Sequence, residues 1–277
     1  MSVVNVPAQQ YRLESVRKQF GRQQMALDGI DLNIVRGERV ALIGPSGAGK
    51  TTLFRLLNCT LRPSSGKLWI DGEDIDLLHG QRLRKVRQRI GSVYQQHNLV
   101  PRLKVIHNVL AGQLGRWPTL PSLLSLFNAA DVELARSALS QVEIADKIFQ
   151  RTDELSGGQQ QRVAIARVLV QNPEVVLADE PVSSVDPTLA STIVRLLIDI
   201  SQGTRKTLLV SLHSVDLALA YFPRVIGIKQ GRIAFDLSPD KISDDMLEDL
   251  YSVNVRDPIA TETTRETVEP IAYSSLG

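Results

Sequence analysis

The alternation of apolar and polar positions divides the chain into regions of different expected structure. In its first part, short apolar runs alternate with polar positions, as in strands, at 11–16, 30–35 and 40–43. A further apolar run, 67–70, lies between Pro63-Ser64-Ser65-Gly66 and Asp71-Gly72, which predicts one strand of a hairpin. The amino-terminal part is therefore expected to contain antiparallel sheet.

Between about residues 103 and 150 the apolar spacing becomes helical, as in Val132, Ala135, Ala138, Leu139 and Val142. Trp117-Pro118 and Pro121 interrupt the segment before this run. These features predict an inserted helical subdomain that spans about residues 97–165.

After Ser156, helical and extended patterns alternate again, which is typical of a parallel sheet covered by helices. We expect a helix to about Val170, a strand at 175–178, a helix from Leu189, a strand at 207–210 and a helix from Val215. The expected fold is α/β: a P-loop NTPase core with a mainly parallel sheet, an N-terminal antiparallel β subdomain and an inserted α-helical subdomain. It occupies residues 1–255, and the aperiodic, Thr/Glu/Ser-rich residues 256–277 form a polar tail.

Composition narrows the class of protein. With 43% hydrophobic residues in 277, the chain can bury a large core, and 32 Lys and Arg against 30 Asp and Glu argue against a nucleic-acid partner. The basic run from Arg82 to Arg89 is interpreted as a solvated helix face. The single cysteine, Cys59, is expected in the core of a protein from a reducing compartment. Neither a signal peptide nor an apolar run of about 18 residues is found, so any membrane association needs a partner.

One motif predicts the binding of a nucleoside triphosphate. The sequence Gly44-Pro45-Ser46-Gly47-Ala48-Gly49-Lys50-Thr51 fits G-x-x-x-x-G-K-S/T and lies between an expected strand, 40–43, and an expected helix, 52–57. Glycines let the backbone amides approach the phosphates, and the following helix N-terminus favours their charge. Lys50 would reach the β- and γ-phosphates, and the Thr51 hydroxyl would bind Mg²⁺.

Two carboxylates follow a second apolar strand. Asp179 and Glu180 come directly after Val175-Val176-Leu177-Ala178, at the strand end where α/β sheets bind their ligands. Asp179 is expected to hold Mg²⁺, directly or through water, and Glu180 to orient and deprotonate the water that attacks the γ-phosphate.

A third motif carries a family resemblance. Leu155-Ser156-Gly157-Gly158-Gln159-Gln160-Gln161-Arg162 is similar to the signature sequence of ABC-type ATPases. The other elements of that family follow in its order: Phe20, Gln95, Ser184-Val185-Asp186 and His213. The resemblance covers about residues 11–236.

The resemblance implies a head-to-tail dimer in which two copies of the chain enclose each ATP. Phe20 would stack on adenine, and Gln95 would sense Mg²⁺ and the attacking water at the hinge of the helical subdomain. His213 would contact the γ-phosphate, and Asp186 would shape the dimer contact. From the partner copy, Ser156, Gly157 and Gly158 would meet the γ-phosphate; Thr52 and Gln159 complete the implied site.

The resemblance also implies partners. Helical subdomains of this family bind transmembrane permease subunits, which places the chain at the cytoplasmic face of the inner membrane, with a solute-binding protein acting indirectly. Several stretches look closest to the ATPases of phosphonate importers, a branch that also handles phosphite and hypophosphite: 94–100, 107–112, 122–127 and 212–219. Two residues depart from that branch, Ser214 where Gln is frequent and Val185 where Leu is usual.

Other functions stay open at this point. The chain could serve an importer of another small polar solute, or be a cell-division type of ABC ATPase that gates a membrane partner. A translation or DNA-repair ATPase would need a second motif set or a long coiled coil, and the sequence contains neither.

Overall fold

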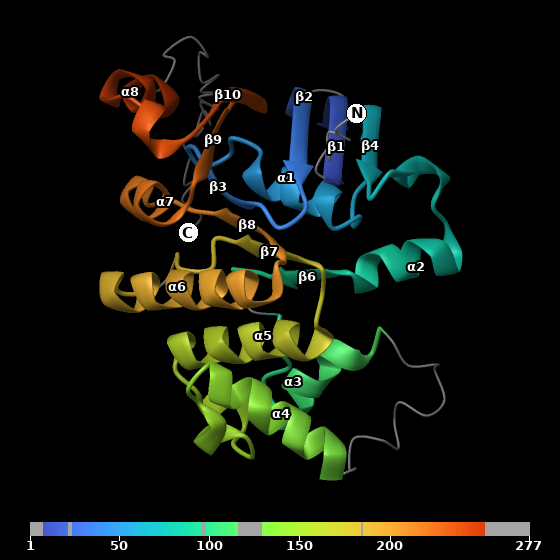
Figure 1. The fold of residues 1–277 in the computed structure, drawn as a ribbon, viewed down its shortest axis with the longest axis vertical. Helices are drawn as coiled ribbons and strands as arrows, with labels where there is room; N and C mark the ends of the chain where they lie inside the picture. The colour runs from blue at the N-terminus through green and yellow to red at the C-terminus, as the bar shows by residue number, and fades with distance from the viewer. Residues whose placement is uncertain (1–7, 22–23, 96–97, 116–128, 184, 253–277) are drawn as a thin grey trace, which may run out of the picture.

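The computed structural model describes residues 8–21, 24–95, 98–115, 129–183 and 185–252. The expected tail at 256–277, the Trp117 to Pro121 interruption, the 122–127 stretch, Gln96, His97 and Ser184 lie outside the described residues. Two β-sheets form one half of the molecule, and the helical segment between residues 98 and 171 forms the other (Figure 1).

The smaller sheet is antiparallel, in the order β2-β1-β4-β5. Its strands are β1 (Gln9–Phe20), β2 (Gln24–Val35), β4 (Ser65–Ile70) and β5 (Glu73–Asp74). Leu13 pairs with Leu32 on one side and with Leu68 on the other, and all three side chains are buried. The expected antiparallel part and the hairpin strand at 67–70 are thus confirmed.

The larger sheet has the order β10-β9-β3-β8-β7-β6, and all its pairs are parallel except that of β10 with β9. Its strands are β3 (Arg39–Ile43), β6 (Ile90–Val93), β7 (Val175–Asp179), β8 (Thr207–Ser211), β9 (Arg224–Lys229) and β10 (Arg232–Leu237). The expected mainly parallel core sheet is confirmed, although β8 ends one residue later than predicted.

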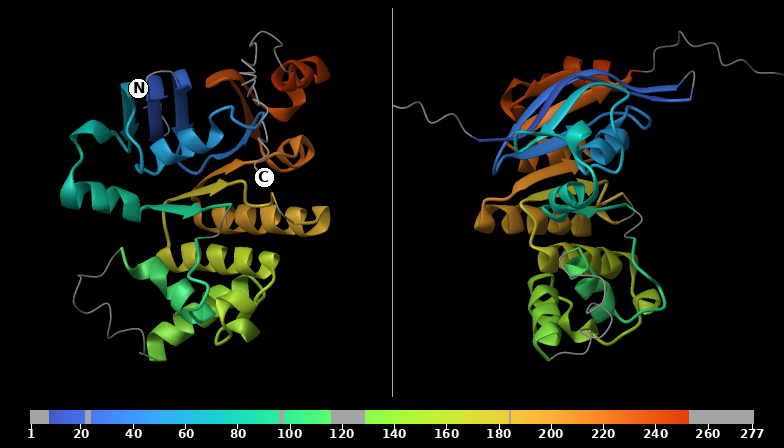
Figure 2. Two further views of the ribbon diagram at one scale, coloured as in Figure 1. Left: turned by 180° about the vertical axis from the view of Figure 1, so that it is seen from behind. Right: turned by 90° about the vertical axis from the view of Figure 1, so that its right-hand side faces the viewer.

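Eight α-helices are described. They are α1 (Lys50–Leu57), α2 (Gly80–Gln88), α3 (Val105–Leu110), α4 (Ala129–Gln141), α5 (Gly157–Gln171), α6 (Pro187–Thr204), α7 (Val215–Tyr221) and α8 (Asp244–Tyr251). α3, α4 and α5 pack together below the sheets, with α6 between α5 and the larger sheet (Figures 1 and 2). No helix of the described residues is long and apolar enough to cross a bilayer.

The two faces of the larger sheet belong to two separate hydrophobic cores. On β3, Ala41 and Ile43 belong to the core formed with α3 to α7, whereas Val40 and Leu42 belong to the core formed with α1 and the antiparallel sheet. Side chains alternate between the faces of a strand, so a run of apolar residues without polar interruption is what a strand buried on both faces requires. The phosphate motif therefore follows a strand that is held on both sides.

Two helices begin before the predicted residue. α1 begins at Lys50 rather than at residue 52. α6 begins at Pro187 rather than Leu189, because the Asp186 carboxylate accepts a hydrogen bond from the Leu189 amide and caps the helix. α5 ends at Gln171, in agreement with the predicted helix to about Val170. It therefore reaches from the helical half to β6, where the Gln171 side chain donates to the Ile90 carbonyl.

Candidate functional site

The phosphate motif forms the loop between β3 and α1, and the close approach of other backbone fixes its shape. A Cβ at Gly44 would lie 2.1 Å from the Ile228 carbonyl oxygen of β9, and one at Gly49 would lie 2.5 Å from that of Ala26 on β2. Both glycines also have positive φ, 148° and 107°. A side chain at either position would therefore collide with backbone that cannot move without its strand.

The turn between β9 and β10 fastens this loop to the antiparallel sheet. The Gly231 amide donates to the Ala48 carbonyl at 2.9 Å, and the Gly231 carbonyl accepts from the Asp28 amide at 2.8 Å. The backbone of the β9–β10 turn thus links the phosphate loop to β2 through hydrogen bonds.

Lys50, at the start of α1, reaches back into the loop. Its ammonium donates to the Gly44 carbonyl at 2.7 Å and to the Pro45 carbonyl at 3.1 Å, and the residue is 4% exposed. Burial lowers the pKa of Lys50, and the charges of Glu180 and Asp179 oppose that shift. A buried ammonium beside a glycine-rich loop suits an anionic ligand such as a phosphate.

The two predicted carboxylates stand at the end of β7, and a residue of the neighbouring strand holds both. Ser211, fully buried on β8, donates to Asp179 Oδ1 at 2.7 Å and accepts from the Glu180 amide at 2.8 Å. Glu180 adopts a left-handed φ of 49°. Sequence reasoning missed Ser211, because no motif contains it and its role depends on the pairing of β8 with β7.

Glu180 lies between two cationic or hydrogen-donating groups. Its Oε1 is 2.8 Å from His213 Nε2 and 3.9 Å from Lys50 Nζ. The structure therefore brings together the predicted base, the predicted γ-phosphate contact and the predicted phosphate lysine, which come from three distant parts of the chain.

Two adjoining cavities share Thr51. The first, of about 220 Å³, is lined by Phe20, Met25 and Glu180 together with Gly47, Ala48, Gly49, Lys50, Thr51 and Thr52. The second, of about 440 Å³, is lined by Thr51, Gln95 and Asp179 among others. The first cavity is thus lined by both Phe20, which is predicted to stack on adenine, and the phosphate loop. The second is lined by all three predicted Mg²⁺ ligands, Thr51, Gln95 and Asp179.

The signature residues lie elsewhere in the molecule. Ser156 caps α5: it accepts from the Gln159 amide at 3.3 Å, and its own amide donates to the Gln159 side chain at 3.0 Å. Ser156, Gly157, Gly158 and Gln159 line neither cavity, and neither does Asp186. α5 and α1 lie in opposite halves of the molecule in every view (Figures 1 and 2).

Comparison with known proteins identifies the family. The family model described as ABC transporter matches residues 27–183, more than half of the chain. The chain belongs to the ABC transporter family.

Its relatives match over nearly the full length. "Phosphonates import ATP-binding protein PhnC 1" of Cupriavidus necator is 46% identical over 268 residues, 96% of each chain. A protein of the same name from Pseudomonas aeruginosa is 51% identical over 229 residues, 83% of this chain and 86% of that one. Both relatives are named as ATP-binding proteins of importers, in agreement with the sequence resemblance.

Solved ABC cassettes share the fold. The dimeric post-hydrolysis structure of the cassette MJ0796, bound to ADP and phosphate, has a TM-score of 0.71 at 32% identity, covering 83% of this chain and 98% of that one. CbiO1 of Clostridium perfringens, described as part of the transporter complex cbiONQ, has a TM-score of 0.73 at 32% identity, covering 84% and 90%. The predicted fold class is therefore confirmed, and the chain is an ABC ATPase that binds ATP.

The ATPase also presents a donor set that fits Mg²⁺. A hydroxyl, an amide oxygen and a carboxylate, from Thr51, Gln95 and Asp179, face one cavity beside the phosphate loop. Mg²⁺ prefers such oxygen ligands and usually takes only one or two carboxylates from the protein.

Proposed function

We propose that this ABC ATPase powers an importer for phosphonate or a related reduced-phosphorus oxyanion. The observation that carries the hydrolytic part is the position of Glu180, whose carboxylate lies 2.8 Å from His213 and 3.9 Å from the lysine of the phosphate loop. The solute is supported by relatives at 46–51% identity that are named as phosphonate import ATP-binding proteins.

Each residue then has a task in hydrolysis. Lys50 binds the β- and γ-phosphates, while Phe20 offers a face for the adenine at the other end of the same cavity. Glu180 accepts the proton of the attacking water, and His213, which donates to Glu180, orients that carboxylate and contacts the γ-phosphate. Ser211 keeps Asp179 and Glu180 at fixed positions.

Mg²⁺ belongs to the proposed site. Thr51, Gln95 and Asp179 would hold it, and when bound it neutralises charge that develops on the phosphate oxygens. Because Gln95 is exposed and lies at the junction of the two halves, its contribution depends on how the helical half is placed.

The site is completed by a second copy of the chain. The signature residues begin a 15-residue helix, whose N-terminus favours an anion, yet they line neither cavity of their own chain. A head-to-tail dimer would bring Ser156, Gly157, Gly158 and Gln159 to the γ-phosphate of the partner copy, with Asp186 at the contact. The dimeric MJ0796 cassette supports this arrangement.

Transport requires further partners. The ATPase would sit at the cytoplasmic face of the inner membrane, bound to transmembrane permease subunits through its helical half, and a periplasmic solute-binding protein would deliver the solute. Closing and opening of the dimer with ATP binding and hydrolysis would supply the motion.

Uptake into vesicles tests the proposal. The ATPase is reconstituted with its neighbouring permease and solute-binding protein, and uptake of a phosphonate, phosphite and phosphate is measured with and without ATP. We expect ATP-dependent uptake of phosphonate or phosphite in preference to phosphate, and loss of uptake by at least about 100-fold in Glu180→Gln, in which the general base is removed. Equal uptake of all three anions would contradict the proposed solute, and uptake unaffected by Glu180→Gln would contradict the hydrolytic assignment.

A further inference from the structure

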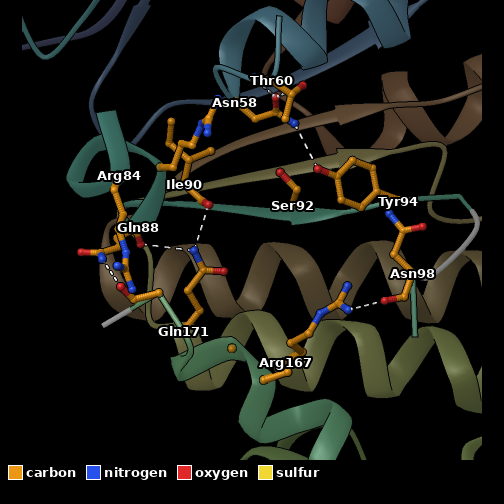
Figure 3. A pocket seen from close by; sticks show the side chains of 14 residues that line it. Asn58, Thr60, Arg84, Gln88, Ile90, Ser92, Tyr94, Asn98, Arg167 and Gln171 are labelled. Carbon is orange, nitrogen blue, oxygen red and sulfur yellow. Dashed lines mark hydrogen bonds between the residues drawn. The ribbon is translucent and has the colours of Figure 1, made fainter. Parts of the chain in front are cut away.

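A third cavity, of about 400 Å³, lies between the two halves of the molecule, beside the segment that carries Gln95. It is lined from the core side by Asn58 and Tyr94, and from the helical side by Arg167 and Gln171, with Asn98 near one end (Figure 3). Two of its side chains form hydrogen bonds to Tyr94 and Asn98, the described residues at the two ends of the segment that carries Gln95.

The core side holds this segment through Tyr94, the residue before Gln95. Asn58 donates from Nδ2 to the Tyr94 hydroxyl at 3.2 Å. Asn58 is 6% exposed, directly follows α1 and accepts from the amide and hydroxyl of Thr60 at 3.0 and 2.7 Å, so its side chain is fixed. The helix that begins with Lys50 and Thr51 therefore also positions the start of the Gln95 segment.

The helical side holds the other end of the segment through Arg167. Its guanidinium donates to the Asn98 carbonyl at 2.6 Å, as Figure 3 shows, and Asn98 has a left-handed φ of 47°. Burial lowers the pKa of Arg167, and the nearby Tyr94 opposes that shift. The Arg167 backbone is fixed as well, because a Cβ at Gly112 would lie 2.2 Å from its carbonyl oxygen.

We propose that Arg167 is a positioning residue for Gln95, an inference that rests on the role proposed for Gln95 in hydrolysis. Arg167 belongs to α5, the same helix that the signature residue Ser156 caps, and it holds a backbone carbonyl three residues after Gln95. Arg167 thus ties Asn98 to α5, while Asn58 ties Tyr94 to the end of α1, so a displacement of α5 would change the position of Asn98 relative to Tyr94 and Gln95. Arg167 makes no contact with nucleotide in this proposal.

The proposal is tested by combining substitutions at the two residues. Steady-state ATPase activity and its Mg²⁺ dependence are measured in the complex with permease for Arg167→Ala, Arg167→Lys, Gln95→Ala and the double variant. We expect Arg167→Ala to lower kcat by about tenfold, as for losses of groups that orient a ligand, with KM for ATP within about twofold. Arg167→Lys, which keeps a donor and a charge, should recover part of kcat. The double variant should be no slower than Gln95→Ala alone, because both changes remove the same function.

Gln171→Ala is the matched control. Gln171 lies one turn further along α5 and lines the same cavity, and it donates to the Gln88 carbonyl, at the end of α2, and the Ile90 carbonyl, at the start of β6, at 3.2 and 2.9 Å. Its kcat should stay within about twofold of wild type even if its thermal midpoint falls as far as that of Arg167→Ala.

The possible results distinguish the role proposed for Arg167 from the role proposed for Gln95. If Arg167→Ala slows the Gln95→Ala enzyme by a further tenfold, or if Gln171→Ala loses as much kcat as Arg167→Ala, Arg167 does not act through Gln95. If Gln95→Ala turns over at the wild-type rate, the role proposed for Gln95 itself is wrong, and that result does not depend on Arg167.

Discussion

At the scale of single residues, Ser211 of β8 holds both acidic residues at the end of β7, Asp179 by its carboxylate and Glu180 by its backbone amide. One hydroxyl donates to Asp179 and accepts from the Glu180 amide. Because both partners are buried or partly buried, neither can replace this bond with water at no cost.

Ser211→Ala should therefore destabilise the protein and slow hydrolysis. Leaving a buried carboxylate oxygen and an amide without this partner is expected to lower the free energy of unfolding by about 1–3 kcal/mol, measured by urea denaturation. Turnover should fall as well, because Glu180 loses the contact that fixes its backbone. Ser191→Ala, at a more exposed position on α6, should change the free energy by less than about 0.5 kcal/mol.

Cys59 should be unreactive in the folded protein. Burial raises the pKa of its thiol to about 11, so at pH 8 only about one molecule in a thousand carries the reactive thiolate. Raising the pH toward 11 increases that fraction. Alkylation followed by mass spectrometry at pH 8 should be slow for the native chain and fast in urea; fast labelling of the native chain would contradict the buried position.

Sequence reasoning found the residues that belong to contiguous motifs and missed those that act across strands. Lys50, Asp179 and Glu180 are predictable because phosphate chemistry needs those side chains beside a glycine-rich loop. Ser211 is not, since its role depends on β8 lying next to β7 with Ser211 opposite Asp179, a pairing that a single sequence does not specify.

At the scale of elements, α5 and α6 begin at capping residues that are also predicted to serve the dimer. Ser156 and Gln159 form a reciprocal cap, and Asp186 caps α6 just before Pro187. Gly158 packs against Leu189, so the two helix starts are in contact. Apolar periodicity places the start of α6 at Leu189, whereas the Asp186 cap and Pro187 place it two residues earlier.

Substitutions at Asp186 can separate its role as the cap of α6 from its predicted role in the dimer contact. Asp186→Ala should lower the free energy of unfolding by about 1 kcal/mol through loss of the cap, whereas Asp186→Asn should keep most of it. Thermal denaturation of the two variants measures this difference. If Asp186 also shapes the dimer contact, ATPase activity should fall in both variants; wild-type activity in Asp186→Asn would limit the carboxylate to capping.

At the scale of the whole molecule, the phosphate loop and the signature helix occupy opposite halves, so the proposed site needs a second copy of the chain. The spacing of apolar positions predicts this division into sheets and a helical insertion. The relative placement of the halves could not be predicted, because it depends on contacts such as those of Arg167 and Gln171 between segments about 70 and 80 residues apart in sequence.

Removing the base should trap the dimer. Glu180→Gln keeps the hydrogen-bonding shape of the side chain and should bind Mg²⁺ and ATP without hydrolysing it, so the purified chain should elute as a dimer in size-exclusion chromatography with light scattering. Lys50→Ala, which removes the buried ammonium of the loop, should remain monomeric at the same ATP concentration. A monomeric Glu180→Gln with bound ATP would contradict the two-chain site.

The backbone contacts that β9 and the β9–β10 turn make with the phosphate loop affect the order in which the protein folds during synthesis. The loop is synthesised early, at residues 44–51, but the Ile228 carbonyl that presses on Gly44 and the Gly231 amide that bonds to Ala48 arrive some 180 residues later. β3 likewise pairs with two strands that are synthesised much later, β8 and β9. During translation we therefore expect the nucleotide site to take its shape, and ATP to stabilise the nascent chain, only after residues up to Gly231 have left the ribosome.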